Sequence, residues 1–220
     1  MKNIYNSVDL TFLKRNATAS DIIMLCERAK EFKVASVCVP SYFVSLAKEN
    51  LKDCDVCVCT VVGFPNGNCS TNAKVAEAKQ AFEDGATEID MVINIGEAVD
   101  EKWDAVSKDI TAIANVVREN QKNNEKALLK VIVETCCLNK EKIERMCQIC
   151  AECGAEYIKT STGFAEQGAT PEVVEIMKRK IDKENYKLKI KASGGIRTIQ
   201  DAKMYLNIGA SRIGASNLSG

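Results

Sequence analysis

The sequence predicts an α/β protein that folds as a single (β/α)8 barrel, and two observations support this. Short β-branched apolar runs alternate with longer segments of helical periodicity, as in parallel strand–helix–strand units. Eight such runs occur within 220 residues, a length near the lower limit for eight strand–helix pairs. An open, doubly wound sheet is the alternative architecture. No linker or composition shift divides the chain, so we expect one domain over residues 1–220.

The strands are predicted from runs rich in Val, Ile, Thr and Cys, several of them continuously apolar, as in strands buried on both faces. They cover residues 7–11, 35–39, 56–63, 88–95, 128–134, 156–160, 188–192 and 211–214. Because the last run ends near Gly214, only a very short final helix is expected after it.

Helices are predicted between these runs from apolar residues three and four positions apart and from capping residues. Apolar stripes of this kind cover residues 75–82 and 103–117. The predicted N-caps are Asn139, Thr170 and Thr198, and the glycines predicted to end helices are Gly85, Gly154 and Gly209.

The composition limits the classes of partner and compartment. Lys plus Arg and Asp plus Glu each number 30, so the chain lacks the basic excess that nucleic acids and acidic membranes attract. No apolar run resembles a signal peptide or a membrane-spanning helix. We therefore expect a cytoplasmic protein whose 11 cysteines are thiols, with no nucleic-acid or membrane partner.

The chain contains no histidine. This excludes Ser-His-Asp and Cys-His catalysis and any zinc site with imidazole ligands. Proton transfer in an enzyme of this composition must use Lys, Asp, Glu, Tyr, Cys or water.

Three charged residues interrupt apolar strands near their carboxyl ends, where barrel enzymes place their active sites. They are Lys159, Lys191 and Asp90. A buried lysine near a second cation has its ammonium form disfavoured, and the free amine can attack a carbonyl. The trio therefore indicates Schiff-base chemistry. The alternative is that each lysine extends from a strand end and pairs with a carboxylate.

Glycine-rich turns follow three of the predicted strands and open into helices or loops. They contain Gly163, the pair Gly194 and Gly195, and Gly214 with Ser216. Loops after the seventh and eighth strands of a barrel frequently bind phosphate through backbone N–H groups. We expect a phosphate site here, with ordinary helix-start turns as the alternative.

Cys147, Cys150 and Cys153 repeat as C-x2-C-x2-C, the opening of a ferredoxin-type cluster motif. They lie within a predicted helix, where small apolar side chains on one face are usually buried. We favour structural thiols, and keep a non-catalytic, Cys-rich binding protein as an alternative function.

The sequence resembles the deoxyribose-phosphate aldolase family over nearly its whole length. The matching segments are DLTFLK (9–14), SVCVP (36–40), VVGFPNG (61–67), EIDMV (88–92), KVIVET (130–135), IKTSTG (158–163) and KASGGIRT (191–198). Each segment alone is a weak signal, but their order along the chain makes the set specific.

The resemblance implies a lyase that reversibly cleaves 2-deoxy-D-ribose 5-phosphate to D-glyceraldehyde 3-phosphate and acetaldehyde in deoxyribonucleoside catabolism, without metal or cofactor. It implies that Lys159 forms the Schiff base, that Lys191 perturbs it and joins proton transfer, and that Asp90 is the proton donor and acceptor. Asp9 is implied as a supporting carboxylate. The glycine turns with Ser216 would hold the phosphate.

Some residues depart from the family pattern. Leu10 stands where many relatives have His, and Asn217 where a second Ser is common. The longer tail whose terminal tyrosine assists proton transfer in some relatives is not present after Gly220, a departure that bears on the turnover rate and not on the type of reaction. Other readings are another phosphosugar barrel aldolase, an epimerase, or a barrel that binds sugar phosphate without chemistry. A homodimer is the expected assembly.

Overall fold

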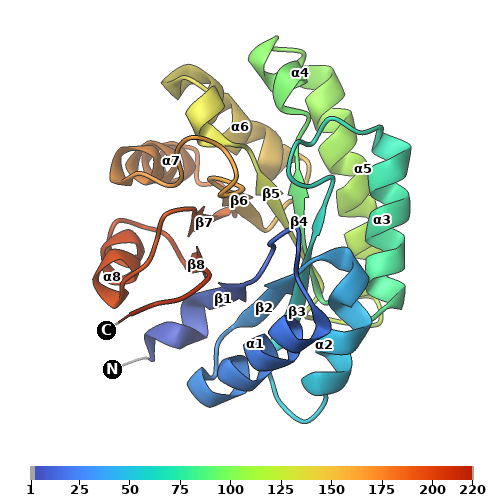
Figure 1. Ribbon diagram of the computed structural model, residues 1–220. Helices are drawn as coiled ribbons and strands as arrows, with labels where there is room; N and C mark the ends of the chain where they lie inside the picture. Colours follow the sequence, from blue (N-terminus) through green and yellow to red (C-terminus); the bar gives the residue numbers. More distant parts are fainter. Residues whose placement is uncertain (1–2, 220) are drawn as a thin grey trace.

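The computed structural model describes residues 3–219, and its eight parallel strands close into a barrel in the order β1 to β8 (Figure 1). The strands are β1 (Val8–Thr11), β2 (Ser36–Val39), β3 (Cys57–Val62), β4 (Glu88–Val92), β5 (Leu128–Ile132), β6 (Tyr157–Lys159), β7 (Lys189–Ser193) and β8 (Arg212–Ala215). Because β1 pairs with both β2 and β8, the predicted barrel is confirmed and the open sheet is excluded.

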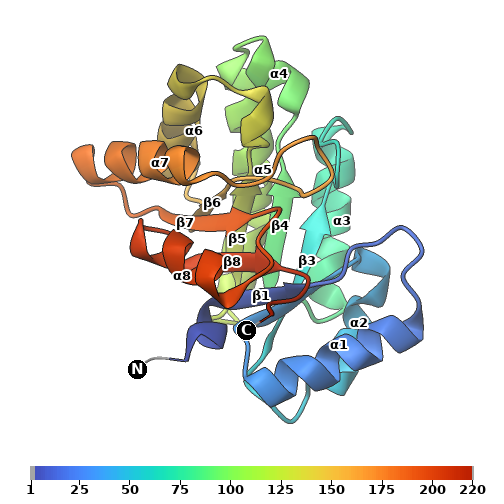
Figure 2. The ribbon, with the colours of Figure 1, turned by 60° about the vertical axis from the view of Figure 1, so that its left-hand side comes forward.

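Helices surround the barrel as an outer ring, which the two views in Figures 1 and 2 show from different sides. They are α1 (Ala19–Phe32), α2 (Val44–Asn50), α3 (Thr71–Glu83), α4 (Ile95–Val99), α5 (Trp103–Gln121), α6 (Lys140–Glu152), α7 (Pro171–Lys183) and α8 (Ile199–Asn207). Short 3-10 segments cover Ile4–Ser7, Ser41–Phe43 and Thr135–Cys137. No helix among residues 3–219 is long and apolar enough to cross a membrane.

The predicted caps are present at the helix ends. The side chains of Asn139, Thr170 and Thr198 each accept a backbone N–H from the first turn of α6, α7 and α8. At α8 the carboxylate of Asp201 also accepts the N–H of Thr198, which completes a capping box. These contacts fix where each helix begins relative to the strand before it.

The structure differs from the expected elements at two places. The apolar run at 88–95 was predicted as one strand, but β4 ends at Val92 and α4 begins at Ile95. Asn94 ends the strand because its side chain accepts the N–H of Glu97 at 3.2 Å and caps α4. The expected short final helix is also different, since residues 216–219 contain no helix and Ser219 bridges to Thr198 beside α8.

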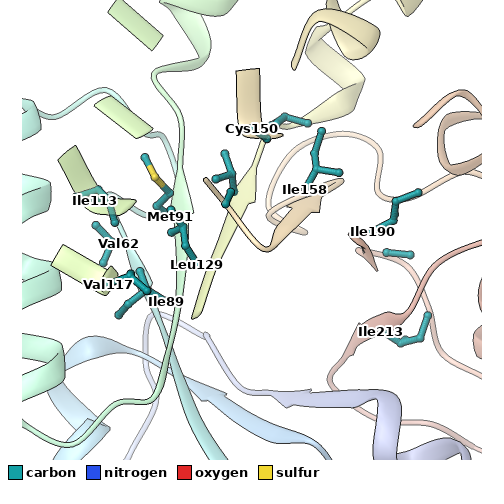
Figure 3. Close-up of a cluster of buried hydrophobic side chains, with 14 of the residues drawn as sticks. Val62, Ile89, Met91, Ile113, Val117, Leu129, Cys150, Ile158, Ile190 and Ile213 are labelled. Atoms are coloured by element: carbon teal, nitrogen blue, oxygen red, sulfur yellow. The ribbon is translucent and has the colours of Figure 1, made fainter. Parts of the chain in front are cut away.

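The two faces of the strands differ sharply in polarity. Residues such as Ile89 and Met91 of β4 face the helices and belong to the apolar core. Figure 3 shows part of this layer, with sheet residues beneath Ile113 and Val117 of α5. The alternate residues Glu88 and Asp90 face the barrel interior, where they are also buried. The hydrophobic core therefore lies between strands and helices, and the interior of the barrel is left for charged groups.

Candidate active site

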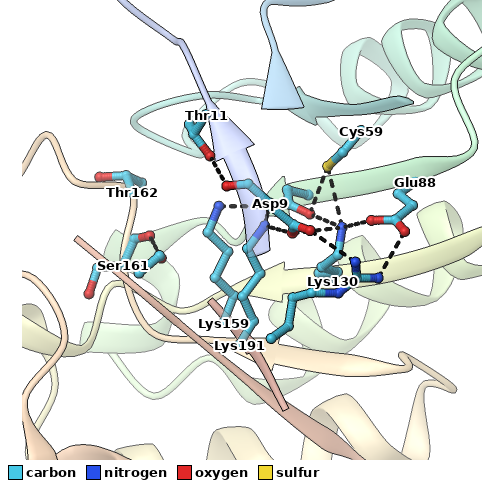
Figure 4. Close-up of polar contacts among 12 residues, drawn as sticks. Asp9, Thr11, Cys59, Glu88, Lys130, Lys159, Ser161, Thr162 and Lys191 are labelled. Atoms are coloured by element: carbon cyan, nitrogen blue, oxygen red, sulfur yellow. Dashed lines mark hydrogen bonds and ion pairs between the residues drawn. The ribbon is translucent and has the colours of Figure 1, made fainter. Parts of the chain in front are cut away.

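A network of charged side chains fills the interior of the barrel (Figure 4). Each member comes from the inward face of a strand, and each is at least nine-tenths buried. The charged members are Asp9, Glu88, Asp90, Lys130, Lys159, Lys191 and Arg212. The three residues proposed from the sequence as Schiff-base lysine, second lysine and acid/base carboxylate lie together within it.

The pairing of the strands places these side chains next to one another. Lys159 on β6 is the register partner of Lys191 on β7, and Asp90 on β4 is the register partner of Lys130 on β5. Inward-facing residues at the same height in a barrel converge on its axis. The two lysines therefore meet the carboxylate across the interior.

Asp90 is the centre of the network because both of its oxygens are shared. Its Oδ2 accepts hydrogen bonds from Lys159 Nζ at 2.7 Å and Lys191 Nζ at 2.6 Å. Its Oδ1 accepts from Lys130 Nζ at 2.7 Å and from the thiol of Cys59 at 3.2 Å. Three ammonium groups thus surround one carboxylate.

A second layer of the network lies deeper in the barrel. Asp9 contacts Lys191 through Oδ2, and its Oδ1 lies 3.0 Å from Arg212 and accepts the hydroxyl of Ser36 at 2.7 Å. Glu88 lies between two cations, with one carboxylate oxygen 2.9 Å from Arg212 and the other 2.6 Å from Lys130. Asp9 therefore contacts both Lys191 and Arg212, and its supporting role in catalysis stays a prediction.

The ion pairs fix the charge states of the network. Burial alone would raise the pKa of Asp90, but Lys130, Lys159 and Lys191 outweigh it and hold that pKa well below its usual range. Burial alone would lower the pKa of Lys191, but Asp9 and Asp90 outweigh it and raise that pKa. Asp90 is therefore a carboxylate and Lys191 an ammonium ion near neutral pH.

Lys159 differs from the other cations of the network in two ways. It contacts one carboxylate, Asp90, whereas Lys191 contacts two and Lys130 three. It is also the one charged member of the network that lines the open cavity among the described residues. Four cations face three carboxylates, so the network holds one excess positive charge. The cavity is where the Lys159 amine would meet a substrate.

The cavity has a volume of about 310 Å³ and opens at the carboxyl ends of the strands. Its far end is lined by Gly163, Gly194, Gly195, Gly214 and Ser216, the residues expected to bind phosphate. The first three have φ values of 83°, 87° and 80°, a left-handed conformation that favours glycine.

Backbone N–H groups at this end are available to a ligand. Within residues 3–219, the amides of Gly163, Gly194, Gly195 and Ser216 donate no hydrogen bond to protein. Such unpaired amides in a glycine turn form an anion-binding concavity. Lys14 and Arg197 also line the cavity and add positive charge there. Asn217 does not line the cavity, and its side chain instead accepts a hydrogen bond from Arg28 at 2.6 Å.

Several site residues were not identified from the sequence. Lys130 lies in the middle of β5, and Glu88 and Arg212 begin β4 and β8, so a rule based on the carboxyl ends of strands does not identify them. Cys59, which is fully buried, contacts Asp90 and accepts a hydrogen bond from Lys130 at 3.3 Å. All four side chains lie on the inward faces of their strands, so the alternation of inward and outward positions is the signal that marks them.

One group of residues has the donor atoms and spacing of a metal site. The sulfur atoms of Cys38 and Cys59 and a carboxylate oxygen of Asp90 lie within 4.8 Å of one another. However, the ammonium groups of Lys130 and Lys159 already occupy that carboxylate. A divalent cation would be placed directly against two positive charges, so the arrangement favours the ion pairs.

Comparison with known proteins gives full-length matches. The model of the family described as DeoC/LacD family aldolase matches residues 4–219, which include all eight strands and the glycine turns. Deoxyribose-phosphate aldolase from Caldanaerobacter subterraneus is 48% identical over 216 residues, covering 98% of this chain and 90% of that protein. The aldolase of the same name from Geobacillus sp. (strain WCH70) is 46% identical over 215 residues, covering 98% and 92%. The tetrameric deoxyribose phosphate aldolase structure from Aeropyrum pernix is 27% identical with a TM-score of 0.87, covering 97% and 86%.

Proposed function

The chain belongs to the DeoC/LacD family of aldolases, and from this we propose that it cleaves 2-deoxy-D-ribose 5-phosphate reversibly to D-glyceraldehyde 3-phosphate and acetaldehyde. The observation that supports this most directly is Lys159, which lines the cavity while its amine contacts the buried carboxylate of Asp90. The catalytic unit is one domain, supported by the closure of all eight strands into one barrel.

Schiff-base formation begins with attack of the Lys159 amine on the C1 aldehyde of the open-chain sugar. The resulting carbinolamine loses water and becomes a protonated imine, which withdraws electrons from C2. We assign proton donation to the departing hydroxyl to Lys191, whose Nζ shares Oδ2 of Asp90 with the Lys159 amine. Asp90 holds both lysines in reach of the reacting carbon.

Carbon–carbon cleavage follows when the C3 hydroxyl loses its proton. The electron pair of the C2–C3 bond moves to the imine, C3 becomes the aldehyde of glyceraldehyde 3-phosphate, and an enamine of acetaldehyde remains on Lys159. Asp90, directly or through one water, is the proton acceptor because its carboxylate is ionised. Protonation of the enamine at C2 and hydrolysis release acetaldehyde and restore the amine.

The phosphate end of the substrate fits the opposite end of the cavity. We assign it to the unpaired amides of Gly163, Gly194, Gly195 and Ser216, with Arg197 adding charge. Binding energy at a group remote from the reacting bond orients C1 toward the amine. The same site would favour phosphorylated over neutral sugars.

The decisive experiment traps the imine. We expect borohydride with acetaldehyde, or with 2-deoxyribose 5-phosphate, to add one reduced adduct per chain, located by peptide mapping on Lys159. Lys159→Met should remove the adduct, whereas Lys189→Met, an exposed lysine on a neighbouring strand, should keep it. An adduct on Lys191 would reverse the roles of the two lysines. No adduct on folded protein would refute the Schiff-base mechanism.

The setting of the enzyme is also part of the proposal. A cytoplasmic location is supported by the 11 cysteines, all of which are free thiols. The names of the relatives above describe aldolases of a phosphosugar, and we propose the same class of small-molecule substrate for this chain. A homodimer is our expectation for assembly, and light scattering during size-exclusion chromatography would test it against the tetramer described for the Aeropyrum pernix protein.

A further inference from the structure

Glu134 is a buried carboxylate beside the cavity that the proposed reaction does not use. It follows β5, is 2% exposed, and has a left-handed backbone with φ 50° and ψ 69°. For a residue with a side chain this conformation costs about 1–2 kcal/mol. Glu134 makes no salt bridge within residues 3–219. A strained, buried carboxylate without a cation requires an explanation from its contacts.

Among residues 3–219, Thr162 makes all the hydrogen bonds that the Glu134 side chain accepts. The N–H of Thr162 lies 3.3 Å from both carboxylate oxygens, and the Thr162 hydroxyl makes a short contact with Oε2. Thr162 follows β6 and lines the cavity three residues after Lys159. The carboxylate therefore holds, through hydrogen bonds, the segment that follows the proposed nucleophile and forms part of the cavity wall.

Backbone contacts on either side of Glu134 strengthen this link. The N–H of Val133 donates to the carbonyl of Lys159 at 3.0 Å, and the N–H of Thr135 donates to the carbonyl of Thr160 at 2.9 Å. These bonds join residues 133–135 to the chain at residues 159 and 160, and the Glu134 side chain extends the contact to residue 162.

The hydrogen bonds between Glu134 and Thr162 also determine the conformation of the turn at Gly163. The Thr162 hydroxyl donates to Glu134 and accepts the N–H of Phe164 at 3.1 Å, so both of its roles are filled. This closes a tight turn around Gly163, whose φ is 83° and whose own amide has no protein partner within residues 3–219. The conformation of that turn sets the direction in which the free amide of Gly163 points.

We propose that Glu134 is a positioning residue that holds Thr162 and Gly163 so that the Gly163 amide binds the substrate phosphate. The inference rests on the proposed function and deepens it. It predicts that Glu134 governs affinity for the phosphorylated end of the substrate, and leaves imine formation at Lys159 intact.

The test compares a phosphorylated and a neutral substrate on the same variants. For Glu134→Ala we expect KM for 2-deoxyribose 5-phosphate to rise about ten- to a hundred-fold, the effect of losing a hydrogen bond to a charged group. The kcat/KM for unphosphorylated 2-deoxyribose should change by only a small factor. Glu134→Gln keeps an acceptor oxygen and should restore most of the affinity.

Two further variants keep the test sharp. Thr162→Val removes the hydroxyl at similar volume and should reproduce the selective rise in KM even if Glu134→Ala fails to fold, whereas Thr162→Ser should remain near wild type. Glu166→Ala removes an exposed carboxylate from the same loop and should leave both substrates unaffected. An equal loss on both substrates, or an unchanged KM, would overturn the positioning role.

Borohydride trapping with acetaldehyde separates this inference from the proposed function. Wild type and Glu134→Ala should both give the adduct on Lys159. If wild type gives none, the Schiff-base mechanism itself is wrong. If both give it and KM for the phosphorylated substrate does not move, only the role of Glu134 is refuted.

Discussion

Asp90 is the residue on which the other charges of the barrel interior depend. It accepts hydrogen bonds from three lysines, and it is the only carboxylate that Lys159 contacts within residues 3–219. Removing its charge would leave Lys159 without a carboxylate contact and would take one carboxylate partner each from Lys130 and Lys191. Its structural and catalytic contributions therefore cannot be separated by deletion alone, and a matched surface control is needed.

We predict that Asp90→Asn lowers the free energy of unfolding by about 3–5 kcal/mol, the cost of leaving buried charges without their partner. Aldol cleavage should fall by roughly a hundred-fold or more, because the proton acceptor is lost. Urea unfolding and steady-state rates measure the two effects. Asp182→Asn, which breaks an exposed pair with Lys178, should cost less than about 1 kcal/mol. A stable and active Asp90→Asn enzyme would contradict both roles.

Single residues were predictable from the sequence where a charge interrupts an apolar strand near its carboxyl end. Lys159, Lys191 and Asp90 were found by that rule, and the structure brings them into contact. Glu88 and Arg212 begin their strands, so the rule did not reach them although they hold the deeper layer of the network. The sequence also does not tell which lysine faces the cavity, since that depends on loops that close over the barrel.

Among the secondary-structure elements, the contact between β7 and β8 sets how close Lys191 lies to the axis. A Cβ at Gly214 would lie 2.8 Å from Ser193 Cβ and 3.3 Å from Lys191 Cε. A Cβ at Gly195 would meet nothing within 4 Å, although its φ is +80°. Gly214 is therefore required for the close packing of β7 and β8, whereas Gly195 is required for its backbone conformation.

Replacing each glycine by Ala should separate these effects. Gly214→Ala should cost about 1–3 kcal/mol by overpacking and lower kcat, because Lys191 is pushed from its position. Gly195→Ala should cost about 1–2 kcal/mol from its left-handed backbone and mainly raise KM for the phosphorylated substrate. Thermal unfolding and steady-state kinetics give both readings. The opposite assignment of kcat and KM effects would show that the phosphate does not bind at Gly195.

A buried ion pair outside the interior network holds two of the surrounding helices to the sheet. Lys74 of α3 lies 2.5 Å from Asp109 of α5 and donates to the carbonyl of Val92, where β4 ends, at 2.8 Å. The Lys74 side chain also passes close beneath Gly63. The pair therefore joins two helices to the ends of two neighbouring strands, away from the reacting groups.

We predict that Asp109→Ala destabilises the protein by about 3–5 kcal/mol because it leaves the Lys74 ammonium buried without its partner. The double variant Lys74→Met with Asp109→Leu should recover a large part of that loss. Urea unfolding measures both, and borohydride trapping on Lys159 should persist wherever the protein is folded. A double variant less stable than Asp109→Ala would show that the pair stabilises the fold through its geometry.

The position of each element was predictable where capping residues mark it. Thr170 and Thr198 cap helices as expected because their side chains bond locally. The boundary between β4 and α4 was missed because the apolar run continues through it, and apolar character alone does not distinguish a strand from a short helix. Asn94 was the available signal, and its capping bond defines the boundary.

For the whole molecule, stability and chemistry are assigned to different layers. The apolar layer between strands and helices supplies the hydrophobic driving force, while the barrel interior holds buried charges whose pairing is sensitive to pH. The sequence also contains no His, so no side chain at its ordinary pKa titrates between about pH 5 and 8.

We predict a melting temperature that is nearly constant from about pH 5 to 8 and falls on both sides. The pKa values of Asp9 and Asp90 are lowered, so their stabilisation is full above the unfolded value near 3.9 and is lost as pH falls below it. Burial raises the pKa of Cys147 to about 12 and that of Cys150 well above its usual value, so their contribution is lost as pH rises above about 8.5. Calorimetry across this range tests the profile, and a steep change between pH 6 and 7 would contradict it.

The pairing of β1 with β8 has a consequence for how activity arises during biosynthesis. Asp9 must meet Lys191 and Arg212, residues separated from it by most of the chain, before the interior charges are neutralised. A ribosome-bound chain that has not yet released its eighth strand holds the proposed nucleophile and Asp90, but lacks Arg212, the cation that pairs with Asp9 and Glu88. Contacts of such long sequence separation form late in folding. The aldolase should therefore become active in a single step, when the ring closes.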